Sequence, residues 1–289
     1  MPAPVRGDFN PTRIPVLQQV ALSYFPQNEM LIADKVFPQV PVPNSEGSCS
    51  NFNEGPWRQV KAQVRPPGTR AARGGYTHSF VNYHCVEWAF AKAVTDEDIR
   101  DAKSLNIPLM EPLKKAVEYA KTQVLLRKEE EISAAIFATS VWGTDATVSD
   151  AWSDYINSDP FDFLDTQADI IQLAKGVPKQ RLKFVQGQQV WNKERRHPLV
   201  IESVRYTGVN SARASIQATT EAHEIKEIIV GGASKETSAQ GASSATNAYF
   251  WGKNGLLLYT PDSPSKQSPS AGYQFVLIVT GKQIGRAHV

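Results

Sequence analysis

The feature that most constrains this chain is a stretch, residues 43–76, with few side chains able to build a core. Short runs of alternating apolar and polar residues are separated there by glycine and proline clusters, a pattern typical of extended strands and turns. We expect a long two-stranded loop that projects from the body of the protein. Because an isolated hairpin is marginally stable in water, this stretch needs packing partners, and neighbouring copies of the chain are the expected ones.

A second pattern predicts a long helix from Glu111 to about Thr139. Apolar residues recur there at steps of three, four or eight, which places them on one helical face: Leu113, Val117, Ala120, Val124, Ile132 and Ile136. Pro112 suits a first helical turn, and Gly143 follows the last apolar position. The outer side carries charges, Glu129 among them, and is expected to be solvated or to face polar surfaces. The same pattern also fits an ordinary surface helix that covers a sheet.

Composition limits the class of protein. The chain has 289 residues, 41% of them hydrophobic, which fits a soluble protein of one or two domains. No stretch approaches the roughly 20 apolar residues that span a bilayer, and the proline-rich N-terminus lacks the apolar run of a secretory signal. We therefore expect cytosolic synthesis and no membrane contact. Cys49 and Cys85 form no CxxC motif, which favours a reducing compartment.

Charge is unevenly distributed, although the net charge is only +2. Residues 56–73 hold bases and no acid: Arg58, Lys61, Arg65, Arg70 and Arg73. Residues 144–174 hold acids and no base: Asp145, Asp150, Asp154, Asp159, Asp162, Asp165 and Asp169. Blocks of opposite sign attract each other, within a subunit or between copies. The expected inter-subunit contacts are Trp57 with those five bases, and Asp145, Asp150 and Asp154. General solubility or weak contact with nucleic acid is the alternative for the bases, and a solvated acidic face is the alternative for the aspartates.

The remaining segments predict an arm followed by two regions. Residues 1–42 form a proline-rich arm, in which Val16–Phe25 can make a short helix. Asp159 and Pro160 mark the start of a helix that ends at Gly176. The segments that follow alternate as in a small α/β layer: strand 181–186, helix 188–197 ended by Pro198, helix 214–224 and strand 226–231. The run 249–259 is predicted to be a hairpin around Asn254-Gly255, and 272–279 a last strand.

The motifs of common catalytic sites are missing. The sequence contains no phosphate-binding loop, dinucleotide fingerprint, nucleophile elbow, HExxH or calcium loop. His78 and His84 would lie on one face of a strand and Cys85 on the other, so no metal site is predicted there. His197 and His223 are single histidines near predicted helix ends, expected to be caps or surface residues. We predict no catalytic residue, cofactor or metal, and no enzyme.

The order of these parts, and several motifs, resemble the major capsid proteins of tailed phages, which have the Hong Kong 97-like fold. The motifs are VFPQVPV, PPGTRAARGGY, EEISAAIF followed by VWGTD, WSDYINSDP, FVQGQQVWNKERRHP and YFWGKNGLLLYTPDSPSKQSPSAGYQF. They contain Trp142, Trp152, Trp191 and Trp251, and together they cover nearly the whole chain.

The resemblance implies an α+β fold with a defined division of the chain. Its parts would be an N-terminal arm (1–42), an extended β-ribbon loop (43–76), a peripheral domain (77–158) with spine helix 111–139, an α/β axial domain (159–260), and a return to the peripheral domain (261–289). Proteins of this type continue with further peripheral strands, so we expect this last part to be incomplete. Residues 283–289 also look like a translated sequencing adapter.

The resemblance also implies a function. The chain would self-assemble as hexamers and pentamers into an icosahedral head around double-stranded DNA, located in the virion and assembled in the bacterial cytoplasm. Scaffolding and portal proteins, and non-specific contact with the packaged DNA, would be further partners. One alternative is an encapsulin-like shell of the same fold, which encloses a cargo enzyme in a bacterial nanocompartment. A soluble α/β enzyme is a distant alternative, which the missing motifs disfavour.

Overall fold

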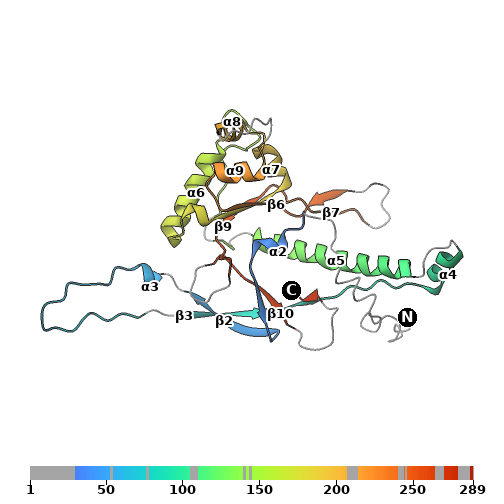
Figure 1. Ribbon diagram of the computed structural model, residues 1–289, viewed down its shortest axis with the longest axis horizontal. Coiled ribbons are helices and arrows are strands. Elements are labelled where there is room, and N and C mark those ends of the chain that lie inside the picture. The colour runs from blue at the N-terminus through green and yellow to red at the C-terminus, as the bar shows by residue number, and fades with distance from the viewer. Residues whose placement is uncertain are drawn as a thin grey trace.

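The computed structural model shows an α/β layer, a long helix beneath it, a lower group of strands and a projecting loop (Figure 1). It describes residues 30–52, 55–75, 78–104, 110–138, 141–142, 145–206, 214–239, 244, 246–263, 270–278 and 287–288. Within these ranges, none of the helices has the length and apolar character needed to cross a membrane.

The α/β layer contains a mixed three-stranded sheet in the order β6-β5-β9. Its strands are β5 (Lys183–Gly187), β6 (Glu227–Gly231) and β9 (Gly255–Leu258), and β5 is parallel to β6 and antiparallel to β9. The helices of the layer are α6 (Pro160–Lys175), α7 (Gln188–Glu194), α8 (Pro198–Tyr206) and α9 (Ile216–Ala222), and the 3₁₀ turn η2 (Lys179–Arg181) precedes β5. The expected alternation of helices and strands is present.

Helix α6 shows how local sequence sets these elements. The Asp159 carboxylate caps its start, accepting from the backbone N–H of Phe161 at 2.9 Å and of Asp162 at 3.2 Å. Gly176 ends it in the left-handed region, at φ 69°. Both predicted ends of this helix are confirmed. By contrast, the helix predicted to run to His197 and end before Pro198 ends at Glu194 as α7, and Pro198 occupies the first position of α8, where its missing N–H costs little.

Helix α5 (Met110–Ile136) is the predicted long helix and ends three residues before Thr139. It lies between the α/β layer and the lower strands (Figure 1). The segment before it runs alongside: the Arg127 guanidinium lies 4.5 Å from the Trp88 ring, and the rings of Phe90 and Tyr119 are 5.6 Å apart. The short helix α4 (Asp96–Ser104) precedes α5 and starts with the acidic run Asp96, Glu97 and Asp98.

Residues 30–42 correct the prediction of an N-terminal arm over 1–42. They form α2 (Ala33–Val36) and β1 (Gln39–Val42), and Ile32 and Val36 are fully buried with residues of α5 and β5. Strand β1 is parallel to β10 (Gln274–Leu277). These apolar residues therefore belong to the core, while Val16–Phe25 lies outside the described residues.

The predicted hairpin around Asn254-Gly255 is wrong. Strand β8 (Asn247–Tyr249) pairs with β7 (Ser234–Glu236), whereas β9 pairs with β5. Trp251 lies between β8 and β9 and is fully buried in the cluster that joins α2, α5 and the sheet. Because the core takes up this large side chain, the chain leaves one strand pair and enters another, and Gly252 makes the bend at φ 55°.

Candidate functional site

The base of the projecting loop is a two-stranded ribbon. Strand β2 (Glu46–Phe52) is antiparallel to β3 (His78–His84). The return strand thus begins after residue 76, beyond the predicted limit of the ribbon. Its Tyr83 ring stacks on Phe275 of β10 at 4.5 Å. Gly47 leaves room for the Tyr83 ring in this position, since a Cβ at residue 47 would lie only 2.6 Å from the Tyr83 hydroxyl. The base is therefore packed against the lower strands.

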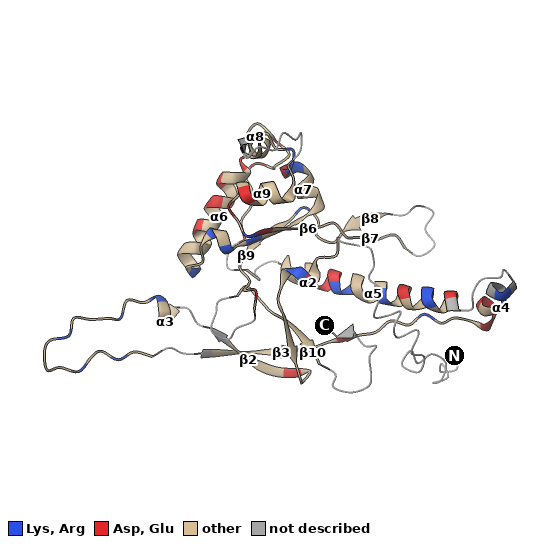
Figure 2. Cartoon of the chain, in the orientation of Figure 1, with Lys and Arg blue, Asp and Glu red and all other residues tan. Residues whose placement is uncertain are grey.

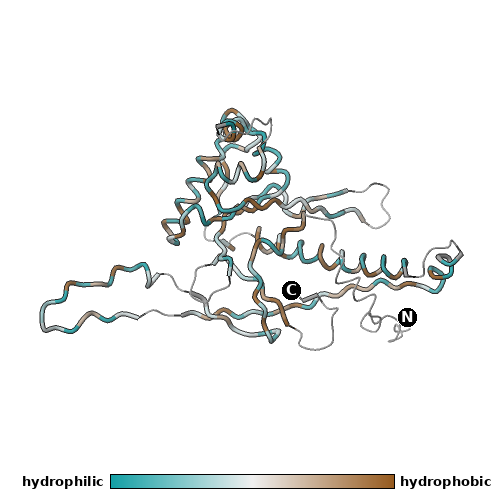
Figure 3. Tube along the Cα trace, in the orientation of Figure 1, coloured by the Kyte–Doolittle hydropathy of each residue, from teal (hydrophilic) through white to brown (hydrophobic). Residues whose placement is uncertain are grey.

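The tip of the ribbon, residues 57–75, has only exposed side chains and extends away from the body (Figure 1). Val60 is 95% exposed and Val64 98% exposed, and hydrophobic and hydrophilic segments alternate along the tip (Figure 3). The chain reverses after Pro66, whose carbonyl accepts from the Thr69 N–H at 3.2 Å. Gly68 has φ +83°, the conformation that this turn requires. The tip therefore lacks any core of its own.

Arg58 fixes the direction in which the tip leaves the body. It ends the short helix α3 (Gly55–Arg58), and its guanidinium donates to the carbonyl of Leu173 at 2.6 Å and to that of Ala174. These are among the last carbonyls of α6, which have no partner within the helix and carry its negative dipole end. Arg58, predicted to contact a neighbour, is thus bound within its own subunit. The other predicted bases, Lys61, Arg65, Arg70 and Arg73, lie along the exposed tip.

The predicted acidic partners lie in the connection from α5 to α6. Asp145 and Asp150 are exposed. Asp154 has a local role, because its carboxylate accepts from the Asn157 side chain at 2.8 Å and the Ile156 N–H at 3.1 Å. These hydrogen bonds lower the pKa of Asp154, with the Asn157 side chain as the largest cause. Bases without acids mark the projecting ribbon, whereas acids and bases alternate along α5 (Figure 2).

Glu129 is a structural residue that was misplaced from the sequence. Predicted on the outer side of the helix, it is only 1% exposed. Its carboxylate accepts from the backbone N–H of Ile32 at 3.0 Å and of Ala33 at 2.9 Å, and from Trp251 Nε1 at 2.6 Å. It thereby joins α5, α2 and the segment that leads to β9. A signal was present, because Glu129 lies seven residues before Ile136, which is buried on the same face.

The two histidines expected to be caps or surface residues are fully buried. His223 is the C-cap residue of α9, and its Nε2 lies 3.0 Å from Oε1 of Glu194. The other carboxylate oxygen of Glu194 accepts a hydrogen bond from the Gln186 amide. The Nε2 of His197 lies 3.1 Å from the Ser158 hydroxyl, and burial lowers the pKa of His197. These groups connect helices to the sheet inside the layer.

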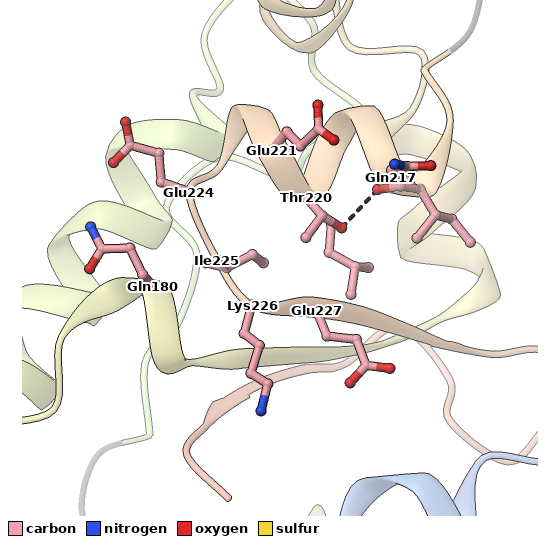
Figure 4. Close-up of a pocket in the computed structure, with 10 residues that line it drawn as sticks. Gln180, Gln217, Thr220, Glu221, Glu224, Ile225, Lys226 and Glu227 are labelled. Carbon is pink, nitrogen blue, oxygen red and sulfur yellow. Dashed lines mark hydrogen bonds between the residues drawn. The ribbon is translucent and has the colours of Figure 1, made fainter. Parts of the chain in front are cut away.

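A hollow of about 560 Å³ lies between α9 and β6. Figure 4 shows Glu221 and Lys226 on its rim pointing in opposite directions, so its charged groups do not converge. Its lining contains no histidine, cysteine or serine. Across the described ranges, histidine, cysteine and acidic side chains nowhere form a group of three or more suited to a metal ion. Neither the hollow nor a metal site gives a candidate functional site among the described residues. The candidate is therefore the ribbon tip, with its exposed apolar and basic side chains.

A solved structure of another protein shares the fold of this chain. No protein-family model and no curated protein matches the chain. It is similar to the crystal structure of a phage-related protein from Bordetella bronchiseptica RB50, with 24% identity over 91% of this chain and 83% of that chain, and a TM-score of 0.65. Similar structures also include the capsid of cyanophage P-SCSP1u and the mature capsid of bacteriophage PhiM1. Each is 12% identical over 90% of this chain and 77% of the other, with TM-scores of 0.44 and 0.49.

The first of these likenesses shows that the chain shares the fold of the Bordetella phage-related protein. A shared fold with a phage-related protein is consistent with the resemblance to tailed-phage major capsid proteins that the sequence shows.

Proposed function

We propose that the chain is a capsid shell protein, the major capsid protein of a tailed phage, and that its copies dock through the ribbon. The observation that carries this proposal is the ribbon tip, whose side chains are all exposed although several are large and apolar. Fixing a residue of an extended chain costs about 1–2 kcal/mol in conformational entropy. Beyond Arg58 the tip buries no side chain within the subunit to offset that cost, so we propose that a neighbouring copy supplies the contact.

The chemistry of the tip fits a protein partner. Interfaces combine buried aromatic or aliphatic anchors with a charged rim, and the tip offers both. Trp57 is 60% exposed, and Val60 and Val64 are nearly fully exposed. Lys61, Arg65, Arg70 and Arg73 supply the positive charge, and Asp145, Asp150 and Asp154 of a neighbouring copy are the acidic surface that we propose for them.

The proposed assembly consists of hexamers and pentamers that form an icosahedral head around double-stranded DNA. In it, the α/β layer would be the axial domain at the capsomer centre, α5 the spine helix of the peripheral domain, and the ribbon the extended loop over the next subunit. The shared fold and the sequence motifs support this arrangement. Scaffolding and portal proteins would join during assembly in the host cytoplasm, and tip bases not used between copies would contact DNA.

Charge reversal at the tip tests the proposal. The variant Arg65→Glu with Arg70→Glu should prevent particle formation, read by size-exclusion chromatography with light scattering and by electron microscopy. Its circular dichroism and unfolding midpoint should match wild type, because the tip buries nothing. The matched control, Lys103→Glu with Lys253→Glu, makes the same charge change at exposed sites away from the tip and should assemble.

Normal particles from the tip variant would contradict the proposed ribbon contact, and a wild-type chain that never forms particles would contradict the shell function. The encapsulin-like alternative has its own signature: a neighbouring gene for a ferritin-like or peroxidase cargo, where the phage assignment expects terminase and portal genes.

A further inference from the structure

Helix α8 is attached to the subunit separately from the core around the sheet. Its buried residues Val200 and Val204 form a small apolar cluster with Ala214 and Ala218, which lie before and within α9, and Phe161 of α6 packs against that cluster. In the part of the chain that the structure describes, α8 adds no residue to the apolar clusters that contain sheet strands or α5. It lies at the end of the α/β layer away from α5 (Figure 1). A movement of α8 would therefore leave the core around the sheet intact.

His197 supplies a polar part of this attachment. It lies between α7 and α8, and its carbonyl accepts from the Ile201 N–H at 3.0 Å, in the first turn of α8. Its imidazole is fully buried, with Nε2 3.1 Å from the Ser158 hydroxyl and the ring centre 5.6 Å from that of Tyr155. Both of these partners precede α6. The imidazole therefore connects the start of α8 to the segment that leads into α6.

The hydrogen bonds identify the nitrogen of His197 that can take up a proton. The Ser158 hydroxyl donates to the carbonyl of Asp154, so toward the imidazole it acts as an acceptor. A neutral imidazole has one N–H donor and one acceptor nitrogen, so Nε2 carries the hydrogen and Nδ1 does not. Nδ1 is buried and has no hydrogen-bond partner among the described residues. It is therefore the atom that a proton would reach, and nothing on the protein would accept from the resulting N–H.

The charged groups around the imidazole do not compensate for its burial. Burial lowers the pKa of His197, and this effect outweighs the carboxylates of Asp159 and Glu194, which favour the charged form. Both carboxylates also have other partners, since Asp159 caps α6 and Glu194 accepts from a buried amide. Arg195 and Arg196 precede His197 in the same turn and add positive charge. The neutral imidazole is thus the form that fits the closed structure.

We propose that His197 makes the attachment of α8 sensitive to acid, because a proton on its Nδ1 opens the contact between α8 and the start of α6. A charged imidazole that is buried without a partner for each N–H is unfavourable, and water reaches Nδ1 only when the α7–α8 turn moves outward. Opening would expose Val200 and Val204, which gives this end of the α/β layer an apolar surface in acid. The device goes beyond the shell function and does not depend on the ribbon contact.

Amide hydrogen exchange on the unassembled protein tests the opening. With a pKa of about 6.5 for the open imidazole and no proton bound in the closed state, the open fraction is about tenfold larger at about pH 5.5 than at about pH 7.5. The protection factor of the Ile201 amide, corrected for intrinsic exchange, should fall by that factor. Low concentrations of urea separate this opening from global unfolding. Exchange at Ile201 should depend less on urea than exchange at Val185 in the central strand β5.

Two matched variants assign the effect to one histidine. His197→Gln can still donate to Ser158 but takes up no proton, so the exchange of Ile201 should lose its pH dependence. The control His223→Gln removes the other fully buried histidine, which faces a carboxylate of Glu194, and should keep the tenfold change. Circular dichroism verifies folding.

An unchanged protection factor in the wild-type protein overturns the proposal, whether or not the variants fold. The same holds for a change that persists in folded His197→Gln, for its loss in folded His223→Gln, and for one opening shared by Ile201 and Val185.

Discussion

Glu129 gives the most direct test of how the parts of this subunit are joined. Its buried carboxylate accepts three hydrogen bonds, from the backbone of Ile32 and Ala33 and from the Trp251 indole. Helix α2 has no capping side chain of its own, so Glu129 acts as its cap from 97 positions away in sequence. Replacing Glu129 with alanine leaves three buried donors without an acceptor.

The expected loss of stability follows from these contacts. A hydrogen bond to a charged group contributes roughly 1.5–3 kcal/mol, so three would sum to about 4.5–9 kcal/mol. Such terms are not additive within one network, and water entering the space would restore part of the bonding. We therefore expect Glu129→Ala to lower the free energy of unfolding by about 3–5 kcal/mol, a large share of the roughly 5–15 kcal/mol of a typical domain. Glu129→Gln should lie between wild type and alanine, since its amide –NH₂ would face an N–H donor.

The adjacent Glu130 is the control. It pairs with Arg127 and Lys235, but its side chain is 34% exposed, so Glu130→Gln should cost less than about 1 kcal/mol. Urea unfolding of the unassembled protein, followed by tryptophan fluorescence, measures both variants. Trp251 is fully buried and bonded to Glu129, so its environment reports on the junction. Equal midpoints for the Glu129 and Glu130 variants would refute the assigned role of Glu129.

Three further substitutions probe other parts of the subunit. Arg58→Ala should speed hydrogen–deuterium exchange in α3 and in the last turn of α6, whereas unchanged exchange would show that Arg58 does not hold the ribbon base. Asp159→Ala should cost about 0.5–2 kcal/mol through the lost cap of α6, with Asp159→Asn closer to wild type in urea unfolding. Burial lowers the pKa of His197, so below pH about 6.5 the unfolded chain binds a proton that the folded chain does not. The free energy of unfolding should therefore fall as the pH drops below that value, and His197→Gln should flatten this slope; an equal slope in wild type and variant would contradict the assignment.

Helices were more predictable than strand partners in this chain, for a physical reason. The ends of α6 depend on neighbouring residues only: Asp159 caps its start and Gly176 ends it. The run 249–259 carries an equally strong local hairpin signal, yet its first segment ends the strand β8, which pairs with the preceding strand β7, and its second segment, β9, pairs with the distant β5. Burial of Trp251 between α5 and the sheet decides that outcome, and this contact joins residues far apart in sequence.

The sequence predicted that the ribbon projects and is exposed, but it did not predict how the ribbon is held to the body of the subunit. The polarity and the glycine and proline content of residues 43–76 indicated a projecting loop, and its tip is exposed throughout. The role of Arg58 was not predictable, because the carbonyls that it binds lie 115 and 116 positions away. The aspartate block likewise mixes functions: Asp154 and Asp159 serve local turns and caps, while Asp162 and Asp169 face solvent.

The buried polar groups lie where parts of the subunit meet, and not on the surfaces proposed to bind other copies. Glu129 joins α5 to α2 and the sheet, and Glu194 joins α7, α9 and β5. Beyond Arg58, the ribbon tip contributes no buried side chain, so its sequence can change without cost to the fold of the body. Substitutions inside should therefore act on unfolding, and substitutions in the tip beyond Arg58 on association alone. Ordering the tip costs conformational entropy, and contacts in the assembly offset that cost. We therefore expect the tip to become ordered when a neighbouring copy binds it.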